Sequence, residues 1–163
     1  MQTSFKIKTV EELAPLLREL RRGGRTVVFT NGCFDLLHVG HVHYLAAARA
    51  EGDLLVVGLN SDRSVRAIKG ERRPIVPEAE RAEILAGLAS VDFVTVFEED
   101  NPLGVIQALQ PDVLAKGGDW AESDIIGADV VKRNGGRVVR IPAVEGAGTS
   151  ALVARILDRY GRT

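Results

Sequence analysis

The stretch 26–45, TVVFTNGCFDLLHVGHVHYL, limits the possible folds of this 163-residue chain more than any other feature. Residues 26–30 are β-branched and aromatic, as in a short strand buried inside a parallel sheet. Apolar residues then recur at helical spacing from Val39 onward. Asn31 and Gly32 lie between the two patterns and permit a sharp turn. The stretch therefore predicts a strand, a tight turn and a helix in succession.

The same alternation continues to the end of the chain. Strands are expected at 54–57, 93–97, 113–115 and 138–141, and helices at 62–68, 77–88, 102–109, 122–133 and 149–160. This alternation predicts an α/β fold: a Rossmann-like, doubly wound parallel sheet of about five strands with helices on both faces. The length of the chain suits a single domain.

The first 23 residues are expected to form a helical extension packed on this domain, which itself spans 24–163. Thr9 and Glu12 have the spacing of a capping box, and leucines follow at helical intervals until Gly23 ends the pattern. Pro15 fits this helix poorly, because a proline past the first turn removes a helix hydrogen bond. We therefore expect a kink or a shifted start at Pro15.

The composition argues against several classes of function. A net charge of −1 and an aromatic content of 5% disfavour binding to nucleic acid. No apolar run approaches the length of a membrane span, so no membrane interaction is expected. Cys33 is the only cysteine, which rules out an intramolecular disulfide and favours a reducing, cytoplasmic location.

Two histidines open the helix that follows the first strand. His38 and His41 are three residues apart and therefore share one face of its opening turn. Unpaired N–H groups and the positive end of the dipole also lie at a helix start, so imidazoles there suit an anion such as a phosphate. His43 lies on another face, where a solvated or structural role is expected.

Residues 32–41, GCFDLLHVGH, resemble the Gly-x-Phe-Asp-x-x-His-x-Gly-His signature of the cytidylyltransferase-like nucleotidyltransferases. Further segments follow in the order seen in the branch of that family that makes ADP-activated heptose from heptose 1-phosphate. They are GLNSD at 58–62, KG at 69–70, RPI at 73–75, ER at 80–81, KGGDW at 116–120 and TS at 149–150. The resemblance covers about residues 24–158.

The resemblance implies a reaction and its substrates. The enzyme would transfer AMP from ATP to a sugar 1-phosphate, most closely D-glycero-D-manno-heptose 1-phosphate, and release pyrophosphate. Mg²⁺ would be carried mainly by the triphosphate, with no metal ligands in the protein. A homodimer is expected by analogy with the family.

The resemblance also assigns roles to particular residues. Catalytic roles fall on His38, His41 and Lys69. Nucleotide binding falls on Asn31, Gly32, Cys33, Phe34, Gly40, Arg81, Lys116, Gly118, Asp119, Thr149 and Ser150. Binding of the acceptor substrate falls on Asp35, Asn60, Asp62 and Arg73. The chain departs from the family pattern at Cys33, where several relatives have Thr, and at Gly148, which replaces the first residue of a Ser-Thr-Thr run.

The order of the elements makes these assignments testable. The segments 31–41, 60–69 and 116–120 each follow a predicted strand directly. The carboxyl ends of parallel strands meet at one edge of a sheet, where ligands bind in doubly wound folds. The three segments should therefore converge although they are far apart in the sequence.

Three other functions stay open at this point. One is a cytidylyltransferase that acts on glycerol 3-phosphate or a related alcohol phosphate. Another is a module that binds nucleotide without turnover. A third is a phosphohydrolase in which Asp35, His38 and His41 hold a transition metal. A dinucleotide site at 146–151, GAGTSA, is rejected because no strand and no acidic residue follow at the required distance.

Overall fold

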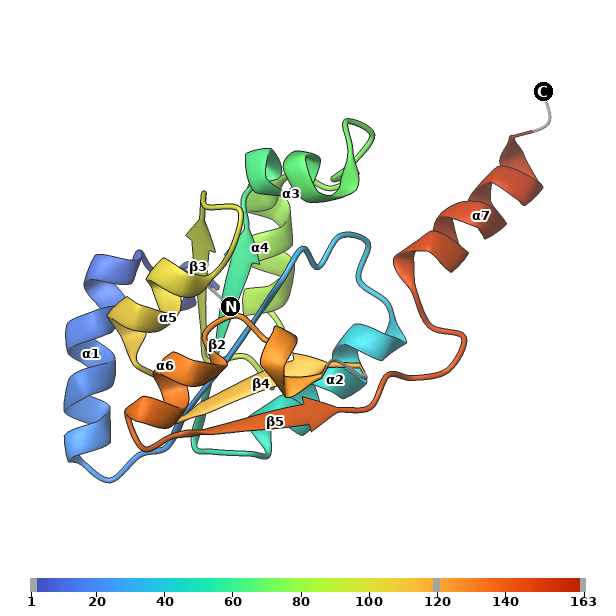
Figure 1. Ribbon diagram of the computed structural model, residues 1–163. Coiled ribbons are helices and arrows are strands. Elements are labelled where there is room, and N and C mark those ends of the chain that lie inside the picture. The colour runs from blue at the N-terminus through green and yellow to red at the C-terminus, as the bar shows by residue number, and fades with distance from the viewer. Residues whose placement is uncertain (1–2, 119–120, 162–163) are drawn as a thin grey trace.

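The computed structural model describes residues 3–118 and 121–161. Over these residues the strands are β1 (Val27–Gly32), β2 (Leu54–Asn60), β3 (Phe93–Phe97), β4 (Val113–Gly117) and β5 (Arg137–Ile141). They form one parallel sheet in the order β3-β2-β1-β4-β5 (Figure 1). The chain moves outward from β1 to β3 and then crosses back to β4 on the other side of β1. This reversal confirms the predicted doubly wound sheet and places its switch point between β1 and β4.

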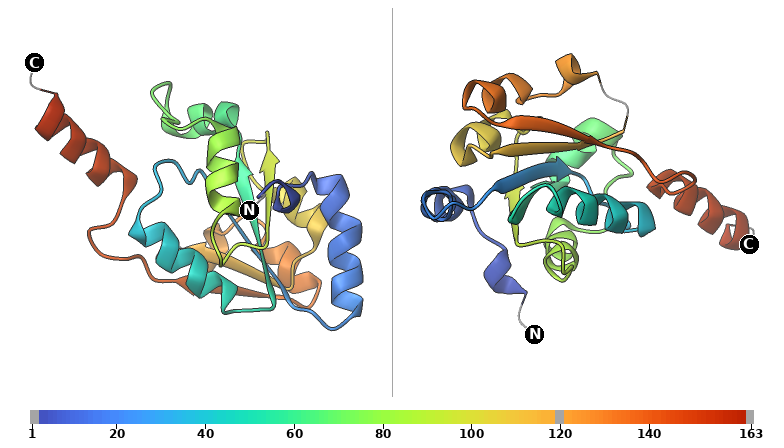
Figure 2. Two further views of the ribbon diagram at one scale, coloured as in Figure 1. Left: turned by 180° about the vertical axis from the view of Figure 1, so that it is seen from behind. Right: turned by 90° about the horizontal axis from the view of Figure 1, so that it is seen from below.

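Helices cover both faces of the sheet, as Figures 1 and 2 show. On one face lie α1 (Val10–Arg22), α5 (Leu103–Leu109) and α6 (Ala128–Arg133). On the other lie α2 (Val39–Arg49) and α4 (Glu78–Ala86). Successive side chains of β1 point to opposite faces of the sheet. Val28 therefore belongs to the apolar core on one face, and Val27 and Phe29 belong to the core on the other.

Two helices leave this layered arrangement. The helix α3 (Asp62–Lys69) follows β2 at the carboxyl edge, and α7 (Thr149–Tyr160) projects away from the sheet (Figure 1). None of the side chains of α7 is buried, and Tyr160 is 77% exposed. The expected helix at 122–133 is instead a 3₁₀ turn, η2 (Glu122–Asp124), followed by α6. Gly127 separates them because its φ of 87° is left-handed.

The N-terminal segment contacts the edge of the sheet and its helical layer. A 3₁₀ turn, η1 (Ser4–Lys6), leads to Ile7, which pairs with Val94 at the edge of the sheet. The capping box of α1 is present, with Thr9 N donating to Glu12 Oε2 at 2.8 Å. The helix runs without a break through Pro15, against expectation. Burial of α1's leucines in the core on both sides of Pro15 offsets the missing hydrogen bond.

Aspartates close the amino edge of the sheet. Asp53, Asp92 and Asp112 directly precede β2, β3 and β4. Each accepts a hydrogen bond of 2.8 Å from a backbone N–H at the start of a neighbouring strand. Arg49 Nε lies 2.9 Å from Asp92 Oδ2 and ties α2 to the same edge. The amino edge is therefore occupied by structural contacts, whereas the distinctive polar residues gather at the carboxyl edge.

In the described part of the chain, no helix is both long and apolar enough to cross a membrane.

Candidate active site

The loop that joins β1 to α2 turns through two left-handed residues, Phe34 (φ 44°) and Leu36 (φ 54°). Between them lies Asp35, which is buried. Its carboxylate accepts hydrogen bonds from Ile75 N and Val76 N, both at 2.9 Å, and from Arg73 Nε at 2.5 Å. Burial alone would raise the pKa of Asp35, but these donors together hold it below its ordinary value. Asp35 thus ties the loop to the segment 73–76.

The two signature histidines lie together at the start of α2. His38 is the N-cap residue, and its ring stacks on that of His41 with centroids 3.8 Å apart and planes 25° apart. The Phe34 ring lies against His41, with centroids 5.3 Å apart. The Nδ1 atoms of both histidines are buried without a hydrogen-bond partner among the described residues.

Burial disfavours the charged state of both imidazoles. Burial and the neighbouring His38 lower the pKa of His41 to about 4. Burial also lowers the pKa of His38. A neutral imidazole has one N–H donor and one acceptor nitrogen. In the free protein each neutral ring can therefore offer one N–H donor to a phosphate oxygen.

A second loop passes close to the histidines. A Cβ on Gly40 would lie 3.0 Å from both Ala147 Cβ and the His38 ring. Glycine at this position therefore lets Ala147 and the His38 ring pack close to the α2 backbone. Thr149 Oγ1 then donates to Asp35 O at 2.8 Å and ties the start of α7 to the β1–α2 loop. Ser150, beside it, is exposed. The predicted pair of hydroxyls is thus brought next to the signature loop.

Lys116 reaches the site from β4. Its Nζ donates a hydrogen bond to Asn31 Oδ1 at the end of β1. Burial lowers the pKa of Lys116 to about 8. Gly118 follows with a left-handed φ of 85°, and its N–H donates to Ile141 O at 3.0 Å. The predicted ligand Asp119 and its neighbour Trp120 lie outside the described residues.

Arg81 is completely buried beneath the β1–α2 loop and the end of β2. Its guanidinium donates to Val76 O (2.9 Å), Cys33 O (2.6 Å), Asn60 O (2.9 Å) and Asp62 Oδ1 (2.7 Å). The Arg81 side chain therefore presents no surface to a nucleotide in this structure. Asn60 is also buried and donates to Ser64 Oγ at 2.9 Å. Three of the predicted binding residues, Arg81, Asn60 and Asp62, are thus linked to one another.

Two further predicted cations, Lys69 and Arg73, lie near the β1–α2 loop. Burial raises the pKa of the Cys33 thiol, although the charges of Lys69, Arg81 and Arg73 oppose that rise. Lys69, the last residue of α3, is exposed, and the Arg73 side chain is 21% exposed. Lys69 and Arg73 therefore lie near the β1–α2 loop and are accessible to a ligand, in contrast to Arg81.

Two residues of this region were not recognised in the sequence. Tyr44 Oη lies 2.6 Å from Thr30 Oγ1 and donates to Ala115 O at 3.1 Å. Thr30 is the first polar residue after the apolar run 27–29 of β1, which is the signal that could have drawn attention to it. Tyr44 gives no such signal, because an aromatic residue on the inner face of a helix reads as ordinary core packing.

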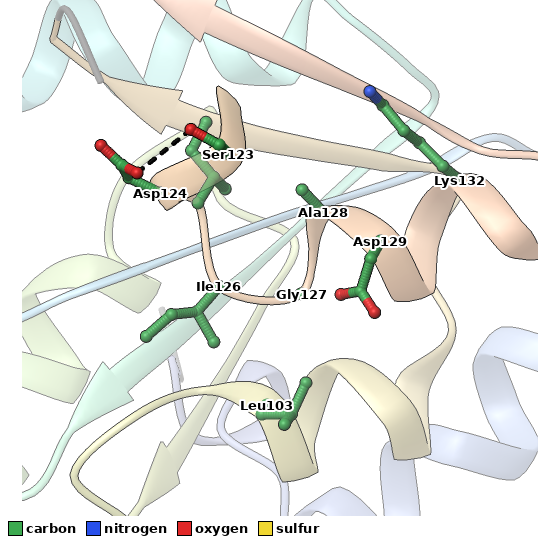
Figure 3. A pocket seen from close by; sticks show the side chains of 9 residues that line it. Leu103, Ser123, Asp124, Ile126, Gly127, Ala128, Asp129 and Lys132 are labelled. Atoms are coloured by element: carbon green, nitrogen blue, oxygen red, sulfur yellow. Dashed lines mark hydrogen bonds between the residues drawn. The ribbon is translucent and has the colours of Figure 1, made fainter. Parts of the chain in front are cut away.

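A separate depression lies between the start of α5 and the segment from η2 to α6 (Figure 3). Its volume is ≈ 470 Å³. Leu103, Ile126, Asp129 and Lys132 are among the residues that line it. None of the predicted site residues lines this depression, so it plays no part in the site at the carboxyl edge.

The metal-site alternative lacks its third ligand. Asp35 accepts hydrogen bonds from the segment 73–76, so its carboxylate is engaged there and not with the histidines. Within 3–118 and 121–161, no group of three or more His, Cys, Asp or Glu side chains is placed to hold a metal ion.

Comparison with known proteins identifies the family of the chain. A family model described as cytidylyltransferase-like matches residues 29–144. The bifunctional protein HldE of Syntrophotalea carbinolica is 56% identical over 160 residues, which are 98% of this chain and 33% of that protein. The bifunctional protein HldE of Campylobacter concisus is 52% identical over 153 residues, which are 94% of this chain and 31% of that protein. The chain thus spans about a third of the length of these curated relatives.

A solved structure shares the fold. The crystal structure of the lipopolysaccharide core biosynthesis protein from Thermoplasma volcanium GSS1 matches with a TM-score of 0.62 and 27% sequence identity. The match covers 76% of this chain and 100% of that one. On the family model, these relatives and the signature at 32–41, the chain belongs to the cytidylyltransferase-like family.

Proposed function

We propose that this chain is a nucleotidyltransferase that joins the AMP part of ATP to D-glycero-D-manno-heptose 1-phosphate, giving ADP-heptose and pyrophosphate. The observation that carries the proposal is the stacked, neutral pair His38 and His41 at the start of α2, with Lys116 and Thr149 brought to the same loop. The order of the further motifs, the HldE relatives and the lipopolysaccharide core biosynthesis structure all support the choice of sugar.

The chemistry requires stabilisation of charge more than a base. A phosphate oxygen of the sugar attacks the α-phosphorus of ATP in line, the bond from that phosphorus to the bridging oxygen breaks, and pyrophosphate leaves. Negative charge builds on the oxygens of the α-phosphate and of the leaving group. Each fixed N–H donor from His38 or His41 can stabilise it by roughly 3 kcal/mol. The attacking phosphate is already ionised, so no general base has to remove a proton from it.

Cations and hydroxyls complete the proposed site. Lys116 and Lys69 would contact phosphate oxygens, and Thr149 and Ser150 would hold the outer phosphates. Arg73, accessible beside Asp35, is assigned to the acceptor phosphate. Mg²⁺ bound to the triphosphate would neutralise part of its charge and orient it. Asp119 retains its proposed role in nucleotide binding.

Arg81, Asp35, Asn60 and Asp62 are assigned a supporting role, because their contacts are within the protein. The backbone N–H groups at Asn31, Gly32, Cys33 and Phe34 are assigned to the phosphates, with Gly40 admitting the ligand.

We also propose that 24–163 is the nucleotidyltransferase domain and that 1–23 is an extension packed on it. Full burial of Leu13 and Leu17 beside Val27 and Phe29 supports this packing.

A homodimer is proposed by family analogy, and the exposed Ile156 and Leu157 on α7 are consistent with a protein contact. Sedimentation of the purified chain measures its oligomeric state. A cytoplasmic location is proposed from the ATP-dependent reaction and the free thiol of Cys33.

The decisive experiment incubates the chain with ATP–Mg²⁺ and a panel of sugar 1-phosphates. Pyrophosphate release is measured, and the nucleotide sugar is identified by mass spectrometry. The proposal expects ADP-heptose from the heptose 1-phosphate and far less product with CTP. A preference for CTP and glycerol 3-phosphate would identify a cytidylyltransferase instead. Binding of ATP without pyrophosphate release from any acceptor would identify a nucleotide-binding module.

A further inference from the structure

The sheet opens at its switch point. Backbone pairing between β1 and β4 is confined to Val28 with Val113 and Phe29 with Leu114. By contrast, β1 stays paired with β2 as far as Gly32, and β4 stays paired with β5 as far as Gly117. The last residues of β1 and β4 therefore lie on two sides of a gap in the ladder.

The side chain of Tyr44 spans this gap from α2. Its hydroxyl donates to Ala115 O on β4 at 3.1 Å, and it lies 2.6 Å from Thr30 Oγ1 on β1. A phenol has one proton, so when it donates to Ala115 O the Thr30 hydroxyl is the donor in the second bond. Burial raises the pKa of Tyr44 to about 12, which keeps that proton in place. The phenol thus replaces a main-chain hydrogen bond that the separated strands do not make.

The packing around the phenol is close. A Cβ on Gly117 would lie 3.3 Å from Tyr44 Cε2, so glycine at the end of β4 makes room for the ring. Thr30 is fully buried, so water has no access to its hydroxyl. Removal of the phenol oxygen would leave two buried polar groups, Ala115 O and Thr30 Oγ1, without their partner.

This placement connects the two halves of the site. Tyr44 lies three residues after His41 on α2, and Lys116 directly follows Ala115 on β4. We propose that Tyr44 is a positioning residue that sets the distance between the histidine pair and the Lys116 ammonium, so that both engage the same bound triphosphate. The inference rests on the proposed function for its substrate, but the contacts that carry it do not depend on the reaction.

The test replaces Tyr44 by Phe, which keeps the ring and removes the hydroxyl. Tyr160→Phe is the matched control, because the same atom is removed from a side chain that is 77% exposed. Rates are measured well below the unfolding temperature with both substrates saturating. Tyr44→Phe should lower kcat by about tenfold to a hundredfold, the loss expected when a reacting group is misplaced. The KM for ATP should change by less than about threefold, because the phenol does not touch the ligand. Tyr160→Phe should match the wild type.

Variants of Thr30 test the positioning role of Tyr44 from the other partner of the hydrogen bond. Thr30→Val keeps the shape and removes the hydroxyl, whereas Thr30→Ser keeps the hydroxyl. Thr30→Val should lower kcat and Thr30→Ser should largely retain it. The double variant Tyr44→Phe with Thr30→Val should lose less than the product of the two single losses, because both break one chain of hydrogen bonds. If Tyr44→Phe does not fold, the Thr30 pair decides the question.

A readout without catalysis separates this inference from the proposed function. Acetylation of Lys116 by acetic anhydride, measured by mass spectrometry relative to Lys69, reports the exposure and basicity of Lys116. Tyr44→Phe should change the Lys116 rate severalfold and leave that of Lys69 unchanged. If the wild type makes no nucleotide sugar, the proposed function fails while the labelling result still stands. Unchanged labelling of Lys116, or an unchanged kcat in an active enzyme, would overturn the positioning role of Tyr44.

Discussion

The imidazole rings of His38, the N-cap of α2, and His41, in its first turn, stack with their centroids 3.8 Å apart. Two charged imidazoles at this distance would repel each other, and both are partly buried. The stack is therefore compatible with two neutral rings, which is the state in which each offers a single N–H donor to a phosphate.

The histidine pair should carry most of the rate acceleration that the side chains supply. His38→Ala and His41→Ala should each lower kcat by about 10²–10³-fold, the usual cost of one fixed donor. The double variant should lose less than the product, since the stacked rings act as a unit. His43→Ala is the control, because His43 is exposed and should stay within about twofold of the wild type. Initial rates of pyrophosphate release measure all four; equal losses for His43 and His41 would refute the assignment.

The low pKa of His41 makes stability fall on acidification. In the folded chain His41 resists protonation until about pH 4, whereas in the unfolded chain it titrates near about pH 6.5. Between these values the unfolded state binds more protons, so the free energy of unfolding decreases as the pH falls through that window. Above about pH 6.5 this contribution is fully present. Urea unfolding from pH 7 to 4 should show a shallower decline for His41→Asn. Parallel pH curves for both proteins would contradict the neutral state of His41.

Anion binding should draw a proton onto Lys116. With a pKa of about 8, the free protein at pH 8 carries this amine about half protonated. A bound phosphate favours the charged form and raises the pKa, so binding of ATP should take up as much as about half a proton. Calorimetry in buffers of different ionisation enthalpy measures the uptake. Lys116→Arg keeps the positive charge but does not titrate in this range, and it should lose the uptake. An uptake that survives in Lys116→Arg would place the titrating group elsewhere.

Gly40 should be indispensable for a steric reason. Gly40→Ala improves helix propensity, but its Cβ would crowd Ala147 and the His38 ring at 3.0 Å. We expect kcat/KM to fall by about tenfold or more, because the histidine is displaced. Gly104→Ala in α5 is the matched control, since the nearest neighbouring atom, Glu99 Oε1, lies 4.0 Å away. This control should keep full activity and gain up to about 1 kcal/mol in unfolding free energy. Equal activity in the two variants would show that the loop yields to the added methyl group.

Stability should depend on the aspartates of the amino edge more than on surface ion pairs. Asp92→Ala removes the acceptor for Leu55 N and the partner of Arg49, and should lower the unfolding free energy by about 1–3 kcal/mol. Asp92→Asn keeps an acceptor oxygen and should recover most of the loss. Asp129→Ala breaks an ion pair with Arg133 in which both side chains are 72% exposed, and should change stability by less than about 0.5 kcal/mol. Urea unfolding at neutral pH compares the three, and a loss for Asp129→Ala equal to that for Asp92→Ala would contradict this ranking.

The sequence predicted the elements well wherever periodicity and turn residues agreed. The strand at 93–97 and the helix at 149–160 match β3 and α7. The helix expected at 122–133 was wrong at its start, because the chain there forms the 3₁₀ turn η2 and α6 begins only after the left-handed Gly127. Pro15 was expected to kink α1 or to shift its start; α1 starts at Val10 and continues past Pro15, where burial of Leu13 and Leu17 offsets a lost hydrogen bond.

What the sequence determined by itself was the kind of fold and the location of the chemistry along the chain. Alternating apolar patterns specify parallel strands and their covering helices, and residues 32–41 identify the family. These signals are local, so neighbouring residues suffice to show them.

Only the tertiary structure decided which polar residues face a ligand and which hold the loops. Arg81 and Lys116 look alike as cations in the sequence. The Arg81 guanidinium donates to backbone carbonyl groups and to Asp62. Among the hydrogen bonds of the described residues, the Lys116 amine donates only to Asn31. Tyr44 has no functional signal in the sequence, yet it bridges Thr30 and Ala115. The reason is physical: a long side chain acts on whatever lies within its reach, and its neighbours come from strands and loops that are distant in the sequence.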